Sequence, residues 1–328
     1  MPTDEPPGSA RPHAVGTSLH RPGEDVQSRR TGPGLRDLVR GAEAVLDEAG
    51  VPSPGHDARA LAAFALRVDR LDLVLPPPLP EGFAGAYAAL VDRRRRREPL
   101  QHIVGATAFR YLRLAVEPGV FVPRPETEVV AGLAVDEAAR VAARVGAGAA
   151  PLVVDLCTGS GAIAVAVATE VPGARVVAVD LSPQAVALAA RNAAASGAAV
   201  RALVGDVRDQ GLLTELDGTV DVVVANPPYI PPDAEPTEPE VREHDPDLAL
   251  YGGGSDGLDV PRAVLVAARR LLAPGGLLVV EHAEVQAEAL RSAATAAGGF
   301  DEPHTVPDLT GRPRALVVRR TTADHGMT

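Results

Sequence analysis

From about residue 151 onward, short apolar segments alternate with segments of helical spacing, and this alternation restricts the fold more than any other feature. Strands that alternate with helices form a mostly parallel sheet with helices on both faces, so this part is predicted to be an α/β domain. In such sheets, ligands bind at the carboxyl ends of the strands. The predicted strands are PLVVDLC, ARVVAVDLS, VRALVGDV, VDVVVANPP, GLLVVEHA and RALVVRR.

The segment before the α/β part is predicted to form a small helical domain. LRDLVRGAEAVLDEAG places Leu35, Leu38 and Val39 on one apolar stripe and stops at Gly50, as an amphipathic helix does. SPGHDARALAAFALRV and EGFAGAYAALVDRRRRR predict further helices, separated by the breaker LPPPLPEG. Residues 1–33 are rich in Pro, Gly, Ser and charge, and this composition predicts a disordered tail.

The chain between the two domains alternates and carries turn residues, which predicts a β-hairpin linker. The run from Arg93 to Arg97 fits either a nucleic-acid patch or, as we favour, a solvated helix end that complements the helix dipole. The predicted division is a disordered tail, a helical domain, the hairpin linker, the α/β domain and a C-terminal tail, at residues 1–33, 34–100, 101–128, 129–320 and 321–328.

The composition excludes several classes of function. The net charge of −11, from 43 acidic and 32 basic side chains, opposes the basic surface that binding to a nucleic-acid backbone requires. Cys157 is the only cysteine, so no internal disulfide and no thiolate cluster for a metal is expected. No apolar run is long enough for a membrane span and no signal peptide is recognisable, so a cytoplasmic location without membrane partners is predicted.

A small-residue loop follows the first strand of the α/β part. Gly159-Ser160-Gly161 and the three residues after it satisfy a G-x-G-x-x-A pattern, with the acid Asp180 further along the chain. This pattern alone also fits a dinucleotide site or a tight turn between strand and helix. Asp155 lies just before the loop, where its carboxylate would repel a pyrophosphate but would pair with a ligand's ammonium group.

Acidic residues end three successive predicted strands. Asp155 would face an amine, Asp180 would accept hydrogen bonds from ribose hydroxyls, and Asp206 would reach an adenine amino group with Val207 against the ring. Each acid could instead cap a following helix. The three together favour S-adenosylmethionine as the ligand.

The fourth strand ends in Asn226, Pro227, Pro228 and Tyr229. An amide or ring amino group is a poor nucleophile, so it must be held with its hydrogens accepted and its lone pair aimed at the methyl group. The Asn226 side-chain oxygen and the Pro227 carbonyl are suited to accept those hydrogens, because a rigid proline turn adds no competing donor. Tyr229 can stack on the planar amide and offer its ring face to a cationic methyl group.

These motifs resemble the HemK/PrmC family of protein glutamine N5-methyltransferases over about residues 35–320. The resemblance implies a class I, Rossmann-like S-adenosylmethionine-dependent methyltransferase fold with a mostly parallel seven-stranded sheet and a helical domain that docks the substrate protein. It implies methylation of the glutamine in the GGQ loop of class 1 peptide chain release factors during translation termination. The matching stretches are REPLQHIVG, FVPRPETE, VVDLCTGSGAIA, VDLSPQAVALAARN, VANPPYIP, LYGGGSDGLDV, LLVVEHAEVQ and DLTGRPR.

The resemblance also assigns roles to residues. Arg124 and Glu126 to Glu128 would form part of the substrate site's wall, although a salt-bridged hairpin explains them equally well. Val207 stands where relatives often carry an aromatic residue, and Cys157 is expected only to pack in the cofactor loop. The predicted cofactor-binding residues are Asp155, Cys157, Thr158, Gly159, Ser160, Gly161, Asp180, Asp206, Val207 and Asn226, and Asn226 to Tyr229 would bind the glutamine.

Three alternatives stay open at this point. A ribosomal-protein glutamine methyltransferase would carry the same motifs. A DNA or RNA amino-methyltransferase would use the same Asn-Pro-Pro-Tyr chemistry on a flipped base but should have a basic face. A nucleotide-binding module without catalysis would leave Asn226 and the residues after it unexplained.

Overall fold

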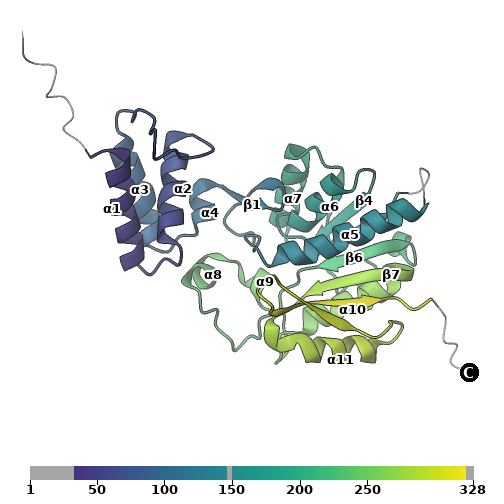
Figure 1. Cartoon of the computed structure of the whole chain (residues 1–328). Coiled ribbons are helices and arrows are strands. Elements are labelled where there is room, and N and C mark those ends of the chain that lie inside the picture. Colours follow the sequence, from purple (N-terminus) through teal and green to yellow (C-terminus); the bar gives the residue numbers. More distant parts are fainter. Residues whose placement is uncertain (1–32, 146–149, 323–328) are drawn as a thin grey trace, which may run out of the picture.

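The molecule, described here from a computed structural model, consists of a helical lobe and a larger α/β lobe (Figure 1). The structure describes residues 33–145 and 150–322. The predicted tails at residues 1–32 and 323–328 lie outside the described residues. The helical lobe and the α/β lobe are joined by a short helix and a hairpin, so the two lobes approach each other beside this connection.

The helical lobe is built from three helices, α1 (Leu35–Glu48), α2 (Pro54–Leu66) and α3 (Phe83–Arg95). They bury a shared apolar core that includes Leu46, Leu61 and Tyr87. The Tyr87 hydroxyl donates to the Ala58 carbonyl at 2.9 Å, which pairs the one polar atom that this side chain brings into the core. The apolar stripe predicted for the first helix therefore does face a core.

The connection between the lobes contains less strand than its sequence predicts. Helix α4 (Leu100–Val104) precedes the antiparallel pair β1 (Ala106–Phe109) and β2 (Leu112–Ala115), and α5 (Thr127–Val145) begins at Thr127. Only about the middle third of the predicted hairpin segment is thus a hairpin. The domain limits themselves stay a prediction.

The α/β lobe contains a seven-stranded sheet in the order β5-β4-β3-β6-β7-β9-β8. The first five strands in this order are parallel, and β9 pairs antiparallel with both β7 and β8, so β9 alone runs in the opposite direction. The predicted mostly parallel seven-stranded sheet is confirmed. The strands are β3 (Leu152–Leu156), β4 (Arg175–Asp180), β5 (Val200–Val204), β6 (Val220–Ala225), β7 (Leu272–Glu281), β8 (His304–Pro307) and β9 (Pro313–Arg319).

Helices cover both faces of the sheet (Figure 1). Val153 packs into the cluster on the side of α5, α6 (Ala162–Glu170) and α7 (Pro183–Ala195). The next residue, Val154, packs into the opposite cluster with α10 (Asp259–Leu271) and α11 (Ala287–Ala297). Because successive strand residues point to opposite faces, a strand covered on both sides reads as a continuous apolar run.

Two short helices, α8 (Pro239–His244) and α9 (Asp247–Leu250), lie in the chain between β6 and α10. In Figure 1, α8 lies between the helical lobe and the α/β lobe. Short 3-10 turns occur at Thr214–Leu216 and Glu284–Gln286. In the described parts of the chain, no helix has the length and apolarity needed to cross a bilayer.

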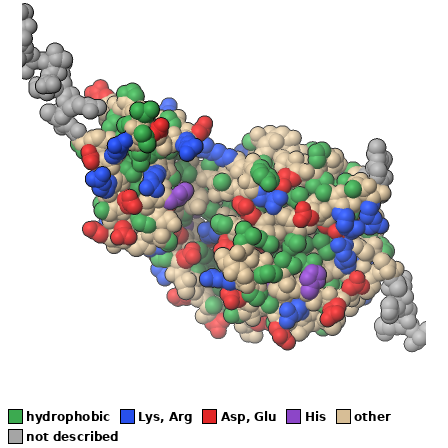
Figure 2. Space-filling view, viewed as in Figure 1, with side chains coloured by type: hydrophobic (Ala, Val, Ile, Leu, Met, Phe, Trp, Pro, Cys, Tyr) green, Lys and Arg blue, Asp and Glu red, His purple; other side chains and the backbone are tan. Residues whose placement is uncertain are grey.

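The arginine run is in part the solvated helix end that we favour, since Arg93 to Arg95 lie in the last turn of α3 and Arg95 and Arg96 are exposed. Arg94 is buried and pairs with Asp57, while Arg95 and Arg96 pair with Asp92 on the exposed side of α3. On the face seen in Figure 2, basic and acidic side chains are interspersed over both lobes. Ion pairs thus engage these arginines, and the prediction of a solvated run was wrong for Arg94.

Candidate active site

The topology places the two most unusual motifs side by side. Strands β3 and β6 are parallel neighbours, and the chain turns away from β3 in opposite directions toward β4 and β6. Ligands of α/β sheets bind at this kind of switch point, beyond the carboxyl ends of the strands. The glycine loop follows β3 and Asn226 follows β6, so both motifs lie at this point.

A cavity of about 520 Å³ opens at this edge of the sheet. That volume lies within the range usual for small-molecule and cofactor sites. Two of the predicted site residues, Asp155 and Gly161, are not among its lining residues. The predicted residues that do line it are Arg124, Glu126, Cys157, Thr158, Gly159, Ser160, Asp180, Asp206, Val207, Asn226, Pro227, Pro228 and Tyr229.

The glycine loop requires its glycines for geometric reasons. Gly161 has φ +83°, and a Cβ there would lie 2.9 Å from the Ala189 Cβ. Gly159 also has a positive φ, and a Cβ there would meet open space. Cys157 adopts φ 59° without being a glycine, and burial raises the pKa of its thiol, which argues against a nucleophilic thiolate. The close packing of the loop on α7 and the tight turn thus explain why glycine occupies these positions.

Asp155 supports the loop from behind. Its Oδ2 accepts hydrogen bonds from the Thr158 hydroxyl at 2.6 Å and from the Ala164 amide at 3.1 Å. Its Oδ1 is buried without a partner in the described chain, and burial raises the pKa of this carboxyl to about 7. The predicted contact with a ligand's ammonium stays a prediction, since this side chain lies off the cavity surface.

Asp180 and Asp206 lie on the cavity wall, and both already accept hydrogen bonds from the protein. The two oxygens of Asp180 accept from the amides of Gly159 at 2.8 Å and Ser182 at 2.9 Å. Helix α7 is capped by the Ser182 hydroxyl, so Asp180 is not the cap that the alternative interpretation required. Asp206 pairs with Arg208 at 2.8 Å, and hydrogen bonds from Arg208 lower the pKa of its carboxyl. Each Asp180 oxygen can still accept a second donor, whereas both Asp206 oxygens already accept two hydrogen bonds from Arg208.

The Asn226 side chain is held by a hydrogen bond to Thr127, the first residue of α5. Its Nδ2 donates to the Thr127 hydroxyl at 3.2 Å, which leaves the amide oxygen as the free acceptor. The Tyr229 carbonyl accepts from Gln286 at 2.7 Å, and the Ile230 carbonyl accepts from Gly252 at 3.0 Å. Within residues 33–145 and 150–322, no protein donor reaches the Pro227 carbonyl. Both acceptors predicted from the sequence are therefore without a protein donor among the described residues, and so is the Pro228 carbonyl.

A buried acid beside Tyr229 was missed from the sequence. Glu281 ends β7, lines the cavity, and is 2% exposed. Its Oε1 lies 3.5 Å from the Tyr229 hydroxyl, and its Oε2 is buried without a partner among the described residues. Burial raises the pKa of Glu281 to about 7, partly offset by the Thr127 hydroxyl and by Arg314. The sequence signal that could have revealed Glu281 is an acid at the end of an apolar strand, at the same edge of the sheet as Asn226.

The wall predicted from PRPETE is only partly correct. Arg124 pairs with Asp245 at 2.5 Å and Glu126 also lines the cavity. Glu128 does not line it, because its carboxylate accepts from the Arg110 amide at 3.0 Å, on the hairpin side. Thr127 and Arg314 complete the polar wall around Tyr229.

The glycines of LYGGGSDGL lie directly behind the Asn-Pro-Pro-Tyr turn. A Cβ on Gly257 would lie 2.3 Å from the Tyr229 carbonyl oxygen, and Gly257 has φ +73°. A Cβ on Gly252 would lie 2.6 Å from the Pro228 carbonyl oxygen. Backbone packed this closely against the turn holds the turn in one conformation.

The glycine loop and its acids fit S-adenosylmethionine. The Ser160 hydroxyl is buried beside the cavity without a protein partner in the described residues, and Asp180 and Asp206 suit a cationic ligand. No cluster of three or more potential metal ligands occurs in the described part of the chain. The cavity thus carries polar groups that suit an organic cation such as S-adenosylmethionine.

Comparison with known proteins agrees with this geometry. Residues 37–105 match the PrmC N-terminal domain, and residues 153–244 match a methyltransferase domain. The chain is 48% identical to the release factor glutamine methyltransferase of Streptomyces coelicolor, over 87% of this chain and 98% of that protein. It is 42% identical to the protein of that name from Bifidobacterium longum, over 86% and 98%. A solved methyltransferase from Pyrococcus furiosus aligns with 70% of this chain and 100% of its own, with 17% identity and a TM-score of 0.48.

Proposed function

This chain belongs to the family of release factor glutamine methyltransferases, and we propose that it methylates the side-chain amide nitrogen of the glutamine in the GGQ loop of class 1 peptide chain release factors. The family membership carries the reaction type and the protein substrate. A glutamine amide is supported as the group that receives the methyl by two oxygens at the cavity, those of the Asn226 side chain and the Pro227 carbonyl, which have no protein donor among the described residues. An amide NH₂ has two hydrogens, which matches two acceptors.

S-adenosylmethionine supplies an electrophilic methyl group when it is bound. We propose that the glycine loop, Asp180 and Asp206 hold this cofactor, and that Asn226 and Pro227 hold the glutamine amide. Both amide hydrogens are then accepted and the nitrogen lone pair is directed toward the reacting methyl position, so catalysis is mainly orientation and electrostatics. Tyr229 forms the wall against which the planar amide packs.

The amide nitrogen must lose one proton in the reaction. An N-methylated amidium is strongly acidic, so water suffices as the acceptor once the methyl group has been transferred. The described residues therefore need to provide only orientation and acceptors, and none has to act as a strong base.

The experiment that tests this proposal is methyl incorporation from labelled S-adenosylmethionine. Purified release factor, its GGQ-loop Gln-to-Ala variant, ribosomal proteins and DNA are offered in parallel. Label on the release factor that vanishes with the glutamine supports the proposal, whereas label only on DNA or a ribosomal protein contradicts it. Asn226→Ala should lower turnover at least about a hundredfold while S-adenosylmethionine still binds, because it removes an acceptor at the reacting amide.

A further inference from the structure

One long segment of the chain contacts both the reaction cavity and the helical lobe. Residues 231–251, called the strap here, leave the Asn-Pro-Pro-Tyr turn, contain α8 and α9, and return beside the same turn. The return is fixed by hydrogen bonds from the Ile230 amide to the Leu250 carbonyl at 2.8 Å and from Gly252 to Ile230 at 3.0 Å. Pro236, Thr237, Glu238 and Val241 of the strap line the cavity, so its position shapes the site.

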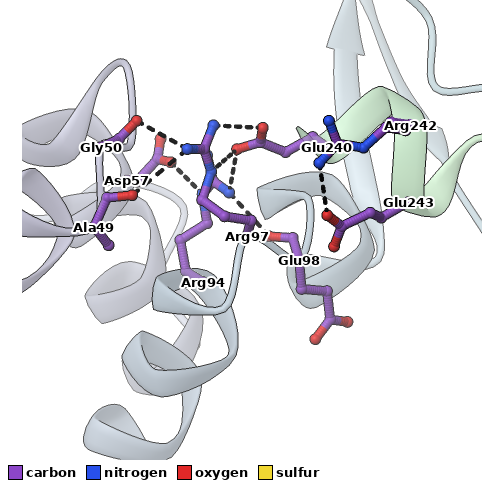
Figure 3. Close-up of polar contacts among 9 residues, drawn as sticks. All are labelled: Ala49, Gly50, Asp57, Arg94, Arg97, Glu98, Glu240, Arg242 and Glu243. Atoms are coloured by element: carbon purple, nitrogen blue, oxygen red, sulfur yellow. Dashed lines mark hydrogen bonds and ion pairs between the residues drawn. The ribbon is translucent and has the colours of Figure 1, made fainter. Parts of the chain in front are cut away.

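The middle of the strap is bound by two arginines of the helical lobe (Figure 3). Arg97 donates to both oxygens of Glu240, at 2.8 and 2.6 Å, although 143 residues separate the two in sequence. Arg94 approaches the same carboxylate at 2.7 Å. A forked arginine contact of this kind specifies direction as well as distance.

The arginines are in turn held by their own lobe. Arg94 donates to Asp57 of α2 at 2.7 Å, and Arg97 donates to the Gly50 carbonyl at 3.1 Å, after α1 (Figure 3). The side chains are largely withdrawn from solvent, with 6% of Arg94, 7% of Asp57 and 12% of Glu240 exposed. The helical lobe therefore presents two arginines that it already holds in place, one of them through Asp57, and the strap's carboxylate binds both.

Apolar packing does not position α8. None of its six residues, all of them described, is fully withdrawn from solvent, and its one aromatic contact joins His244 to His102 of α4, with 6.2 Å between the ring centroids. Burial alone would raise the pKa of Glu240, but hydrogen bonds from Arg97 and Arg94 outweigh it and hold the pKa at about 2. The carboxylate is thus ionised at neutral pH, and its ion pairs are the main directional contact of α8 with the helical lobe.

We propose that Glu240 is a positioning residue for methyl transfer, because its pairing with Arg94 and Arg97 sets where the strap lies along the wall of the reaction cavity. The effect on turnover rests on the proposed function, whereas the effect on the strap does not. A buried ion pair contributes little net stability relative to apolar packing, so its role here is to select one arrangement of the strap. The helical lobe is thereby coupled to the site through this contact.

The test compares Glu240→Gln with a matched control, Glu170→Gln. Glu170 also accepts a forked arginine contact, from Arg110 at 2.6 Å, and its side chain is 16% exposed, but it joins the hairpin to α6 away from the strap. Amide hydrogen exchange of residues 230–252 and kinetics with release factor are measured on the full chain for both variants and for the unmodified chain.

Glu240→Gln should accelerate exchange at Ile230 and Gly252 and lower kcat/KM about tenfold or more, because a displaced wall misaligns the bound groups. Glu170→Gln should leave both unchanged. In a double-mutant cycle, Arg97→Gln should add little to the effect of Glu240→Gln, since either change breaks the same contact.

Two results would overturn the proposal: exchange in the strap that matches the unmodified chain, or equal losses of kcat/KM in the two glutamine variants. Failure of the proposed function looks different, because the unmodified chain would then leave the release factor unlabelled. Exchange across residues 230–252 and the affinity for S-adenosylmethionine, measured by calorimetry, would still decide the role of Glu240.

Discussion

The side-chain amide of Asn226 donates a hydrogen bond to the hydroxyl of Thr127, with 3.2 Å between Nδ2 and Oγ1, although the two residues are 99 positions apart. Thr127 is the first residue of α5 and is 3% exposed. An Asn amide can rotate to present either its oxygen or its nitrogen to a ligand. In the observed orientation the threonine hydroxyl accepts from the nitrogen, and the Asn226 oxygen is the free group.

Replacing this hydroxyl should affect turnover more than cofactor binding. In Thr127→Val, which keeps the shape but removes the hydroxyl, we expect kcat to fall about tenfold to a hundredfold because the Asn226 oxygen is no longer held in place. Thr127→Ser keeps the donor and acceptor and should retain most activity. Steady-state methylation of release factor and calorimetric titration with S-adenosylmethionine measure the two effects. A serine variant as poor as the valine variant would contradict this role.

The buried acid Glu281 should make stability depend on pH. Its pKa is about 7 in the folded chain, above the ordinary glutamate value of 4.5 that applies to the unfolded chain, so below pH 4.5 it is protonated in both states. Between these values the unfolded chain ionises and the folded chain does not, so the stability contributed by the protonated group is lost as pH rises through 7. The shift corresponds to about 3 kcal/mol for this fully buried group.

Melting curves between pH 5 and 8, without ligand, check this expectation. The unmodified chain should lose stability relative to Glu281→Gln as pH rises. Glu137→Gln is the control, since hydrogen bonds from Arg319 and Arg140 overcome the effect of burial and lower the pKa of Glu137 to about 2. Its difference from the unmodified chain should stay constant over the same range, and a constant difference for Glu281→Gln would rule out the buried-acid interpretation.

Gly257→Ala should destabilise the chain. The added Cβ would meet the Tyr229 carbonyl oxygen at 2.3 Å, and the backbone has φ +73°. We expect a loss of about 2 to 4 kcal/mol in the free energy of unfolding by denaturant. Gly41→Ala, within α1 and without any atom within 4 Å of the new Cβ, should instead be neutral or stabilising by up to about 1 kcal/mol. Equal effects of the two changes would refute the close-packing argument.

Asp180→Asn should weaken binding of S-adenosylmethionine about tenfold or more, because charged acceptors contribute about 1.5 to 3 kcal/mol per hydrogen bond. The neutral amide also keeps only one oxygen for the amides of Gly159 and Ser182. Asp209→Asn is the matched control, since Asp209 accepts from Gly211 in an exposed turn outside the cavity. Equilibrium titration of both variants with S-adenosylmethionine measures the effect. Similar affinities of the two variants for this cofactor would show that Asp180 does not bind it.

Some parts of the fold could be recognised locally and others could not. The strands buried on both faces carry a continuous apolar signal, as Val153 and Val154 illustrate, and the predicted sheet follows from them. Strand β8 lacks that signal, because its four residues, His-Thr-Val-Pro, include only one aliphatic strand-forming residue, whereas the other edge strand, β5, reads Val-Arg-Ala-Leu-Val. It was accordingly absent from the predicted strands.

The sequence by itself determined the α/β class, the helical lobe, and the placement of the glycine loop and of Asn226 at strand ends, because the period of apolar residues and the turn residues are local properties. Only the tertiary structure decided that Thr127 and Glu281 flank the Asn-Pro-Pro-Tyr turn and that Arg97 binds Glu240. These contacts depend on strand order and on how the two lobes pack. Neither is encoded in the spacing of residues along the chain, since each contact joins segments that are brought together only when the whole sheet and both lobes have assembled.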